Sequence, residues 1–142
     1  MKIMKNKVTI YVPTKNRVDL LKRAVDSVQA QTYTNWELIV VNDASTDGTY
    51  QYLEDIKSSK IKVIHQPESQ GACVARNLAI NSATGDFVTG LDDDDYFEPN
   101  RLQLFIDGWK AKPENVSVLF EGRKKKKRGG NLEYKNYVID MF

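Results

Sequence analysis

Phe87-Val88-Thr89-Gly90-Leu91-Asp92-Asp93-Asp94-Asp95 joins a mostly apolar run to four consecutive carboxylates. The apolar part, 87–91, has the length and composition of a buried strand. Carboxylates this close together repel one another unless a cation joins them. At the end of a strand they would offer oxygen ligands to a hard divalent metal, whereas most acidic runs are solvated loops. The rest of the chain is needed to choose between a metal site and a loop.

Strand signals alternate with helix signals on both sides of this run. Segments rich in β-branched and apolar residues are predicted strands, at 8–12, 37–41, 61–65, 86–91 and 116–120. Segments with apolar residues at helical spacing are predicted helices, at 19–31, 48–57, 71–82 and, with Pro99 in its first turn, 99–111. Such alternation implies right-handed crossovers and a mostly parallel sheet with helices on both faces, a Rossmann-like α/β fold.

The composition excludes several classes of protein. The net charge of +2 over 142 residues is too small to indicate a nucleic-acid partner. A single Cys73 excludes an intrachain disulfide framework, and a single His65 argues against the usual zinc sites. Residues 1–7 are polar and basic without an apolar region behind them, and no apolar run approaches the roughly 20 residues that span a bilayer. These features predict a cytoplasmic protein.

The character of the sequence changes at Gly122, so we expect a core at 1–121 and a second, incomplete region at 122–142. Residues 123–128 form an unbroken basic run. This run is either a solvated loop or a peripheral membrane contact, to which each Lys or Arg would contribute about 1 kcal/mol. The sequence stops on the apolar residues 138–142, which suggests that it belongs to a longer protein.

Polar clusters follow three of the predicted strands, at 13–17, 42–48 and 92–95. Ligands of an open parallel sheet bind beyond the carboxyl ends of its strands, so these clusters are expected to converge on one site. Asn, Asp, Ser and Gly are also common turn residues, but Asp43 directly follows an apolar strand and is predicted to be functional. Glycine-rich phosphate loops are absent from the sequence, so a nucleotide would be held through its base, its ribose and a metal.

Several motifs occur in order along residues 8–120. They are Val-Pro-Thr-Lys-Asn-Arg (12–17), Gln31-Thr32-Tyr33, Trp36-Glu37, the run 41–49, Gly71 with Ala75-Arg76-Asn77, Ala83-Thr84-Gly85-Asp86, and the run 91–95 with Pro99. In these motifs the chain resembles the GT-A-fold glycosyltransferases of family 2, an inverting group that uses nucleotide sugars. The resemblance implies that residues 1–121 form a GT-A core that binds the donor.

The resemblance also implies a base pocket. Asp43 would bind the uracil ring of a UDP donor, and the loop that carries Pro13, Thr14, Asn16 and Arg17 would form the pocket wall. Many members of the family place an aromatic residue for base stacking at the position after Thr14, where this chain has a lysine.

Further residues match the part of the family site that holds ribose and diphosphate. Asp92, Asp93 and Asp94 match the D-x-D motif: Asp93 would approach the ribose, and Asp94 with Asp92 would hold Mg²⁺ or Mn²⁺ on the diphosphate. Arg76 would reach the phosphates, although a solvent-facing charge on a helix is an equal alternative.

The implied function is metal-assisted, inverting transfer of a sugar from a nucleotide donor to a saccharide or lipid-linked acceptor. The catalytic base of the family is a carboxylate in the second half of the domain, and it is expected beyond Phe142. We therefore expect the chain to bind donor and metal but to transfer sugar poorly or not at all. The alternative is a nucleotide-binding module without catalysis.

Overall fold

The computed structural model describes residues 5–111, 118–120 and 137–139. The chain divides into two compact units, Met1–Leu102 and Gln103–Phe142, each of which is described by itself. The expected boundary after residue 121 and the basic run at 123–128 lie outside the described residues.

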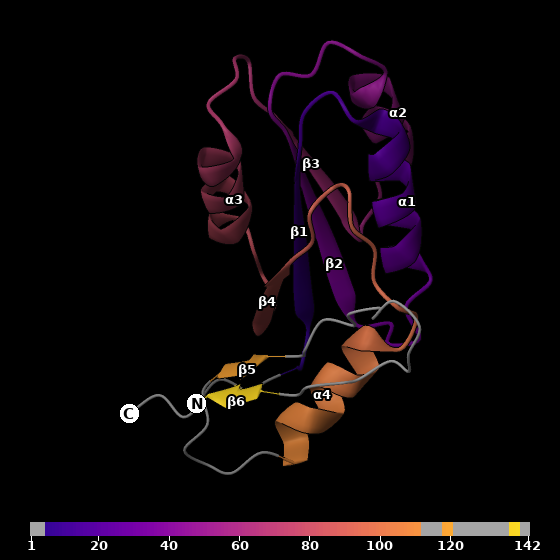
Figure 1. Ribbon diagram of the computed structural model, residues 1–142, viewed down its shortest axis with the longest axis vertical. Coiled ribbons are helices and arrows are strands. Elements are labelled where there is room, and N and C mark those ends of the chain that lie inside the picture. Colours follow the sequence, from indigo (N-terminus) through magenta and orange to yellow (C-terminus); the bar gives the residue numbers. More distant parts are fainter. Residues whose placement is uncertain (1–4, 112–117, 121–136, 140–142) are drawn as a thin grey trace, which may run out of the picture. The chain divides into compact units, whose positions relative to one another are not determined.

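A four-stranded sheet forms the centre of the first unit. Its strands are β1 (Val8–Thr14), β2 (Trp36–Asn42), β3 (Ile61–His65) and β4 (Phe87–Gly90), arranged in the order β3-β2-β1-β4 (Figure 1). Every neighbouring pair is parallel, which confirms the predicted parallel α/β architecture. The strand order reverses at β1, because β2 and β3 extend from one side of it and β4 from the other. A crevice at the carboxyl ends of β1 and β4 is the expected place for a ligand.

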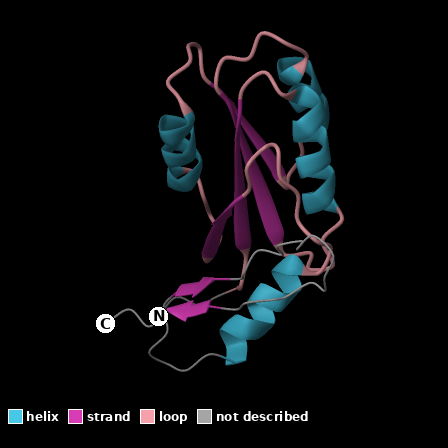
Figure 2. Ribbon diagram, viewed as in Figure 1, coloured by secondary structure: helices cyan, strands magenta, loops and turns pink. Residues whose placement is uncertain are grey.

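Helices cover both faces of this sheet, as predicted. They are α1 (Val18–Gln29), α2 (Thr49–Ile56) and α3 (Ala72–Asn81). Figure 2 shows α3 on one face, and α1 with α2 on the other. No helix in the described part of the chain is long and apolar enough to cross a membrane.

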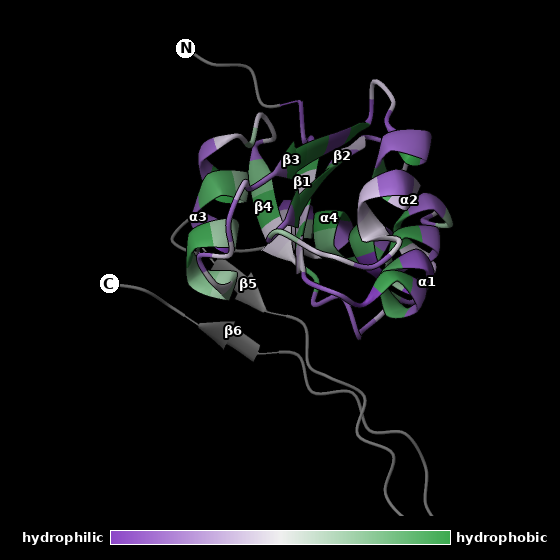
Figure 3. Cartoon of the chain, turned by 90° about the horizontal axis from the view of Figure 1, so that it is seen from above, coloured by the Kyte–Doolittle hydropathy of each residue, from purple (hydrophilic) through white to green (hydrophobic). Residues whose placement is uncertain are grey.

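The core follows from the alternation of side chains along the strands. Ile39 and Val41 of β2 pack against Ala75 and Ala79 of α3, where small side chains let the helix lie close to the sheet. The alternate positions Ile10, Val12, Leu38 and Val40 are fully buried and therefore point toward α1 and α2. In Figure 3 the strands are largely green, and much of the purple lies on α1, α2 and the loops.

The second unit contains most of α4 (Arg101–Ala111), with β5 (Val118–Phe120) and β6 (Tyr137–Ile139). The helix begins two residues after Pro99, where it was predicted to start, because Glu98 O accepts a hydrogen bond from Arg101 N in a preceding turn. β5 confirms part of the predicted strand at 116–120, but it does not extend the parallel sheet. It pairs in antiparallel fashion with β6, a strand that the sequence analysis did not predict.

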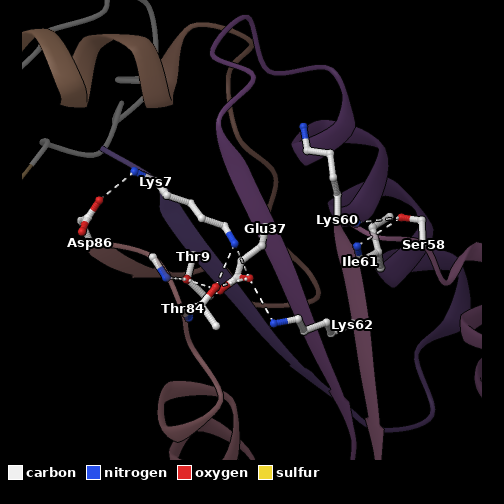
Figure 4. Close-up of polar contacts among 10 residues, drawn as sticks. Lys7, Thr9, Glu37, Ser58, Lys60, Ile61, Lys62, Thr84 and Asp86 are labelled. Atoms are coloured by element: carbon white, nitrogen blue, oxygen red, sulfur yellow. Dashed lines mark hydrogen bonds and ion pairs between the residues drawn. The ribbon is translucent and has the colours of Figure 1, made fainter. Parts of the chain in front are cut away.

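A buried carboxylate, Glu37, joins several segments at the amino-terminal end of β2 (Figure 4). Its Oε2 accepts hydrogen bonds from Lys7 Nζ (2.8 Å), Lys62 Nζ (3.2 Å) and Thr84 Oγ1 (2.8 Å). Its Oε1 accepts from Thr9 Oγ1 and Thr84 N, both at 2.7 Å. Burial raises the pKa of Glu37, but these hydrogen bonds outweigh burial and hold the pKa far below its ordinary value. The Trp36-Glu37 motif therefore serves the fold, at the end of the sheet opposite the predicted site.

Gly85 follows Thr84 at a point where a side chain has no room. A Cβ there would lie 2.7 Å from Lys7 O and 2.8 Å from Thr9 N, which are backbone atoms that cannot rotate away. We expect Gly85→Ala to lower the free energy of unfolding by about 2–3 kcal/mol, measured by urea denaturation. Gly48→Ala is the matched control, since nothing lies within 4 Å of its Cβ position. Equal losses in the two variants would contradict this explanation.

Candidate functional site

A pocket of about 450 Å³ opens at the carboxyl ends of the strands. All of the predicted site residues except Asn16 line it: Pro13, Thr14, Arg17, Asp43, Arg76, Asp92, Asp93 and Asp94. Lys15 and two alanines of α3, Ala72 and Ala75, complete the lining. The three polar clusters of the sequence thus converge on one cavity, at the edge of the sheet where the strand order reverses.

Asn16 lies beside the pocket and joins two loops. Its backbone is left-handed, with φ at 52°, a conformation that asparagine tolerates better than most residues. Its Oδ1 accepts a hydrogen bond from Thr46 N (2.7 Å), and its own N–H donates to Ser45 Oγ (2.9 Å). In the structure Asn16 therefore positions the loops that follow β1 and β2, and its contact with a nucleotide stays a prediction.

Asp43 is buried and holds the loop between β3 and α3. Its Oδ1 accepts from Gln70 N (2.7 Å) and its Oδ2 from Ser69 Oγ (2.7 Å) and Gly71 N (3.0 Å). Burial raises the pKa of Asp43, but these hydrogen bonds and the nearby charge of Lys15 outweigh it, so the pKa lies below its ordinary value. Asp43 is an ionised acceptor in the pocket wall.

The loop that Asp43 holds was missed by the sequence analysis. Gly71 has φ at 89°, a left-handed conformation that favours glycine, and it comes immediately before α3. The glycine before a helical pattern was the one available signal. Nothing in the local sequence connects Ser69 and Gln70 with Asp43, because the contact depends on β2 and β3 being neighbours.

Asp93 joins the two strands on either side of the crevice. It is only 6% exposed, its Oδ2 accepts from Thr14 Oγ1 (2.9 Å), and its Oδ1 accepts from Arg17 Nη1 (3.1 Å). The middle carboxylate of the predicted D-x-D motif is therefore turned toward β1, and it fixes the acidic loop against the residues that follow β1.

The other three carboxylates of the run form a group that could hold a metal. Asp92, Asp94 and Asp95 are exposed, and one ligand oxygen from each lies within 4.8 Å of the others. A set of carboxylate oxygens suits Mg²⁺ or Mn²⁺, which fits the predicted ligands Asp92 and Asp94. Asp95 was not predicted; a turn in which Asp95 N donates to Asp92 O (3.0 Å) brings it to the same side.

Arginines surround this acidic group. Arg76 Nη2 donates to Asp92 Oδ1 (3.2 Å), so the predicted phosphate contact lies in the pocket and beside the metal ligands. Arg17 Nη1 also contacts Asp94 Oδ2 (3.3 Å), and Arg23, which the sequence analysis did not consider, donates to the backbone oxygen of Asp94. These contacts bring three guanidinium groups to the acidic run, and those of Arg17 and Arg76 line the pocket.

Gln31, two residues after the end of α1, anchors the same acidic loop. Its Nε2 donates to Ser27 O (3.1 Å) and Glu98 O (2.7 Å), and its Oε1 accepts from Leu102 N (3.0 Å). These bonds explain why a buried glutamine follows α1, and they fix the far end of the loop that carries the carboxylates.

Residues 9–139 match the family model described as glycosyl transferase family 2. The chain belongs to this family. Among curated relatives, WcaA of Escherichia coli K12, named for colanic acid biosynthesis, is 46% identical to this family 2 chain over 107 residues. That match covers 72% of this chain and 38% of WcaA. The UDP-Glc:alpha-D-GlcNAc-diphosphoundecaprenol beta-1,3-glucosyltransferase WfgD of Escherichia coli is 37% identical over 99 residues, which are 70% of this chain and 39% of WfgD.

Solved structures confirm the GT-A fold of this family 2 chain. TarS 1–349 of S. aureus in complex with UDP superposes with a TM-score of 0.75 at 28% identity, over 88% of this chain and 38% of TarS 1–349. The mannosyltransferase PcManGT of Pyrobaculum calidifontis, in complex with GDP-Man and Mn²⁺, gives a TM-score of 0.68 at 28% identity, over 83% of this chain and 35% of PcManGT. The chain spans about two fifths of the length of the curated relatives WcaA and WfgD.

Proposed function

We propose that this chain binds a nucleotide-sugar donor, with UDP as the nucleotide, and that it forms the donor side of an inverting glycosyltransferase. One observation carries the proposal: a single pocket is lined both by the ionised, buried Asp43 and by Asp92 and Asp94, two members of the acidic group. The pocket volume of about 450 Å³ lies within the range of small-molecule sites. The UDP complex of TarS and the GDP-Man and Mn²⁺ complex of PcManGT support a nucleotide and a metal here.

The residues of the pocket have separate tasks in this proposal. Asp43 accepts a hydrogen bond from the base, and Asp93, held by Thr14 and Arg17, lies at the ribose. Arg76 contacts Asp92 in the structure and has further N–H groups that can donate to a phosphate oxygen. The donor would therefore lie along the crevice between the carboxyl ends of β1 and β4.

Asp92 and Asp94, with Asp95 beside them, would hold Mg²⁺ or Mn²⁺. Such an ion, when bound, neutralises a diphosphate and stabilises it as a leaving group. The oxygen-only donor set of the three carboxylates is the observation that fits these hard cations.

Transfer also needs a base that removes the proton of the acceptor hydroxyl. The pocket carboxylates have other tasks: Asp43 and Asp93 are engaged in hydrogen bonds, and Asp92 and Asp94 are assigned to the metal. We expect the base beyond Phe142, as the family resemblance implies, and binding without transfer for this chain by itself. Sugar transfer by residues 1–142 would contradict the assignment of the base.

The acceptor is proposed to be a saccharide or a lipid-linked saccharide, because the name of WfgD contains a diphosphoundecaprenol acceptor.

Calorimetry of UDP binding tests the donor site and the metal together. We expect UDP to bind in the presence of Mn²⁺ and to lose at least about tenfold in affinity in EDTA, because the diphosphate then meets the carboxylates of the acidic run without a metal ion between them. Equal affinity in Mn²⁺ and EDTA would remove the metal from the proposal. Failure of UDP to bind under either condition would overturn the donor site.

A further inference from the structure

Lys15 lies on the pocket wall close to Asp43. Its Nζ donates to Ser69 Oγ (2.8 Å), and Ser69 Oγ in turn donates to Asp43 Oδ2 (2.7 Å). A single hydroxyl group thus separates an ammonium from a carboxylate, and both charged side chains line the same cavity. The pocket therefore contains a strong hydrogen-bond donor next to a strong acceptor.

Each of these two groups retains bonding capacity for a ligand. A carboxylate has about four acceptor positions, and Asp43 uses two on Oδ2 and one on Oδ1, which leaves a position on Oδ1. An ammonium has three N–H donors, and Lys15, whose side chain is exposed, directs one of them to Ser69. A ligand that offers an N–H beside a carbonyl oxygen would satisfy both groups at once.

We propose that Lys15 and Asp43 together recognise the lactam edge of a nucleobase, the adjacent N–H and C=O that uracil and guanine share. The N–H donates to Asp43 Oδ1 and the carbonyl oxygen accepts from Lys15 Nζ. Cytosine and adenine present the opposite pattern, a ring nitrogen acceptor beside an amino donor, which places an acceptor against the carboxylate and a donor against the ammonium. This inference rests on the proposed function and adds Lys15 as a residue that determines which base is bound.

A role for Lys15 on the phosphates is the competing explanation. The contacts favour the base, because Ser69 ties Lys15 to Asp43, whereas Arg17 and Arg76 are the cations tied to the acidic run. The two explanations differ in an observable way. A phosphate contact acts on every nucleoside diphosphate alike, whereas an edge contact acts on some bases and spares others.

The test compares UDP with CDP, which differ at this edge and have the same ring size, and GDP with ADP, by calorimetry in Mn²⁺. We expect the wild-type chain to prefer UDP over CDP by at least about tenfold, the value of one hydrogen bond to a charged group. Lys15→Met should weaken UDP binding by about tenfold and change CDP binding less than about twofold. Lys15→Arg should restore part of the preference. Lys22→Met, on the exposed face of α1, is the matched control and should change neither affinity.

The outcomes separate this inference from the proposed function. Equal weakening of UDP and CDP by Lys15→Met would assign Lys15 to the phosphates and overturn the inference, while leaving the donor site in place. Equal affinity of the wild-type chain for UDP and CDP would also overturn the inference and leave the donor site in place. If the purine nucleotides bind measurably, GDP should bind more tightly than ADP. Tighter binding of ADP than of GDP would also overturn the inference. Binding of none of the four diphosphates would overturn the proposed function, and the inference with it.

Discussion

Asp94→Ala is expected to weaken the binding of UDP in Mn²⁺ by at least about tenfold, nearly as much as EDTA weakens binding to the wild-type chain, because it removes a proposed oxygen ligand from the group of three carboxylates. The fold should be unaffected. Asp94 is exposed, and Arg17, which contacts it, retains its hydrogen bond to Asp93 at 3.1 Å. Calorimetry in Mn²⁺ and again in EDTA is the measurement. In EDTA the variant should bind UDP as weakly as the wild-type chain does.

Two further variants make this result specific. Asp94→Asn keeps the shape and loses the charge, so it should also lose metal dependence. Asp19→Ala removes a carboxylate of α1 that is 92% exposed, and it should leave UDP binding unchanged. If Asp94→Ala kept the full difference between Mn²⁺ and EDTA, the metal would have to be placed on other residues.

Glu37→Ala is expected to lower the free energy of unfolding by about 2–4 kcal/mol at neutral pH. The substitution leaves Thr9 Oγ1 and Thr84 N without the acceptor they share, and it leaves Lys7 and Lys62 without their common counter-ion. The loss stays below that of a fully enclosed ion pair, because both lysine side chains are partly exposed and can be hydrated. Urea denaturation of the wild type, Glu37→Ala and Glu37→Gln measures it.

The stabilisation of the folded chain by Glu37 should depend on pH. The folded chain holds the pKa of Glu37 below the ordinary value of 4.5 that it regains on unfolding. The stabilisation is therefore complete above about pH 4.5 and declines as the pH falls through the acid range below it. The difference in stability between the wild type and Glu37→Gln should shrink over that range. A difference that stayed constant down to acid-induced unfolding would show that the charge of Glu37 is not its source.

The sequence predicted the elements of the sheet well, because apolar periodicity and turn residues are local signals. It also located most of the pocket, since the carboxyl ends of parallel strands must lie at one edge. It could not predict the direction in which each carboxylate of the acidic run points. Asp93 turns toward Thr14 and Asp95 joins the metal group because of a turn, and four identical side chains in a row carry no pattern that distinguishes them.

Contacts between residues far apart in the sequence could not be predicted either. The contacts of Asp43 with Ser69 and Gln70 follow from the pairing of β2 with β3, which the local sequence of neither segment encodes. Asn16 matched a family motif as a nucleotide contact, whereas its left-handed backbone and its bonds to the next loop emerge only in three dimensions. The antiparallel pairing of β5 with β6 was not predicted, because the sequence of a short strand does not indicate its pairing partner.

The strand order has a consequence for how the pocket comes into existence. Thr14 and Asp93 are 79 residues apart, and they meet only when β4 docks on the outer side of β1. A partly folded chain that contains β1, β2 and β3 but not β4 lacks one wall of the pocket. A ligand of this pocket therefore binds the completed sheet and no earlier species, so its free concentration should raise the melting temperature by mass action. Ligand binding is therefore coupled to the docking of β4, which comes after β1, β2 and β3 in the sequence.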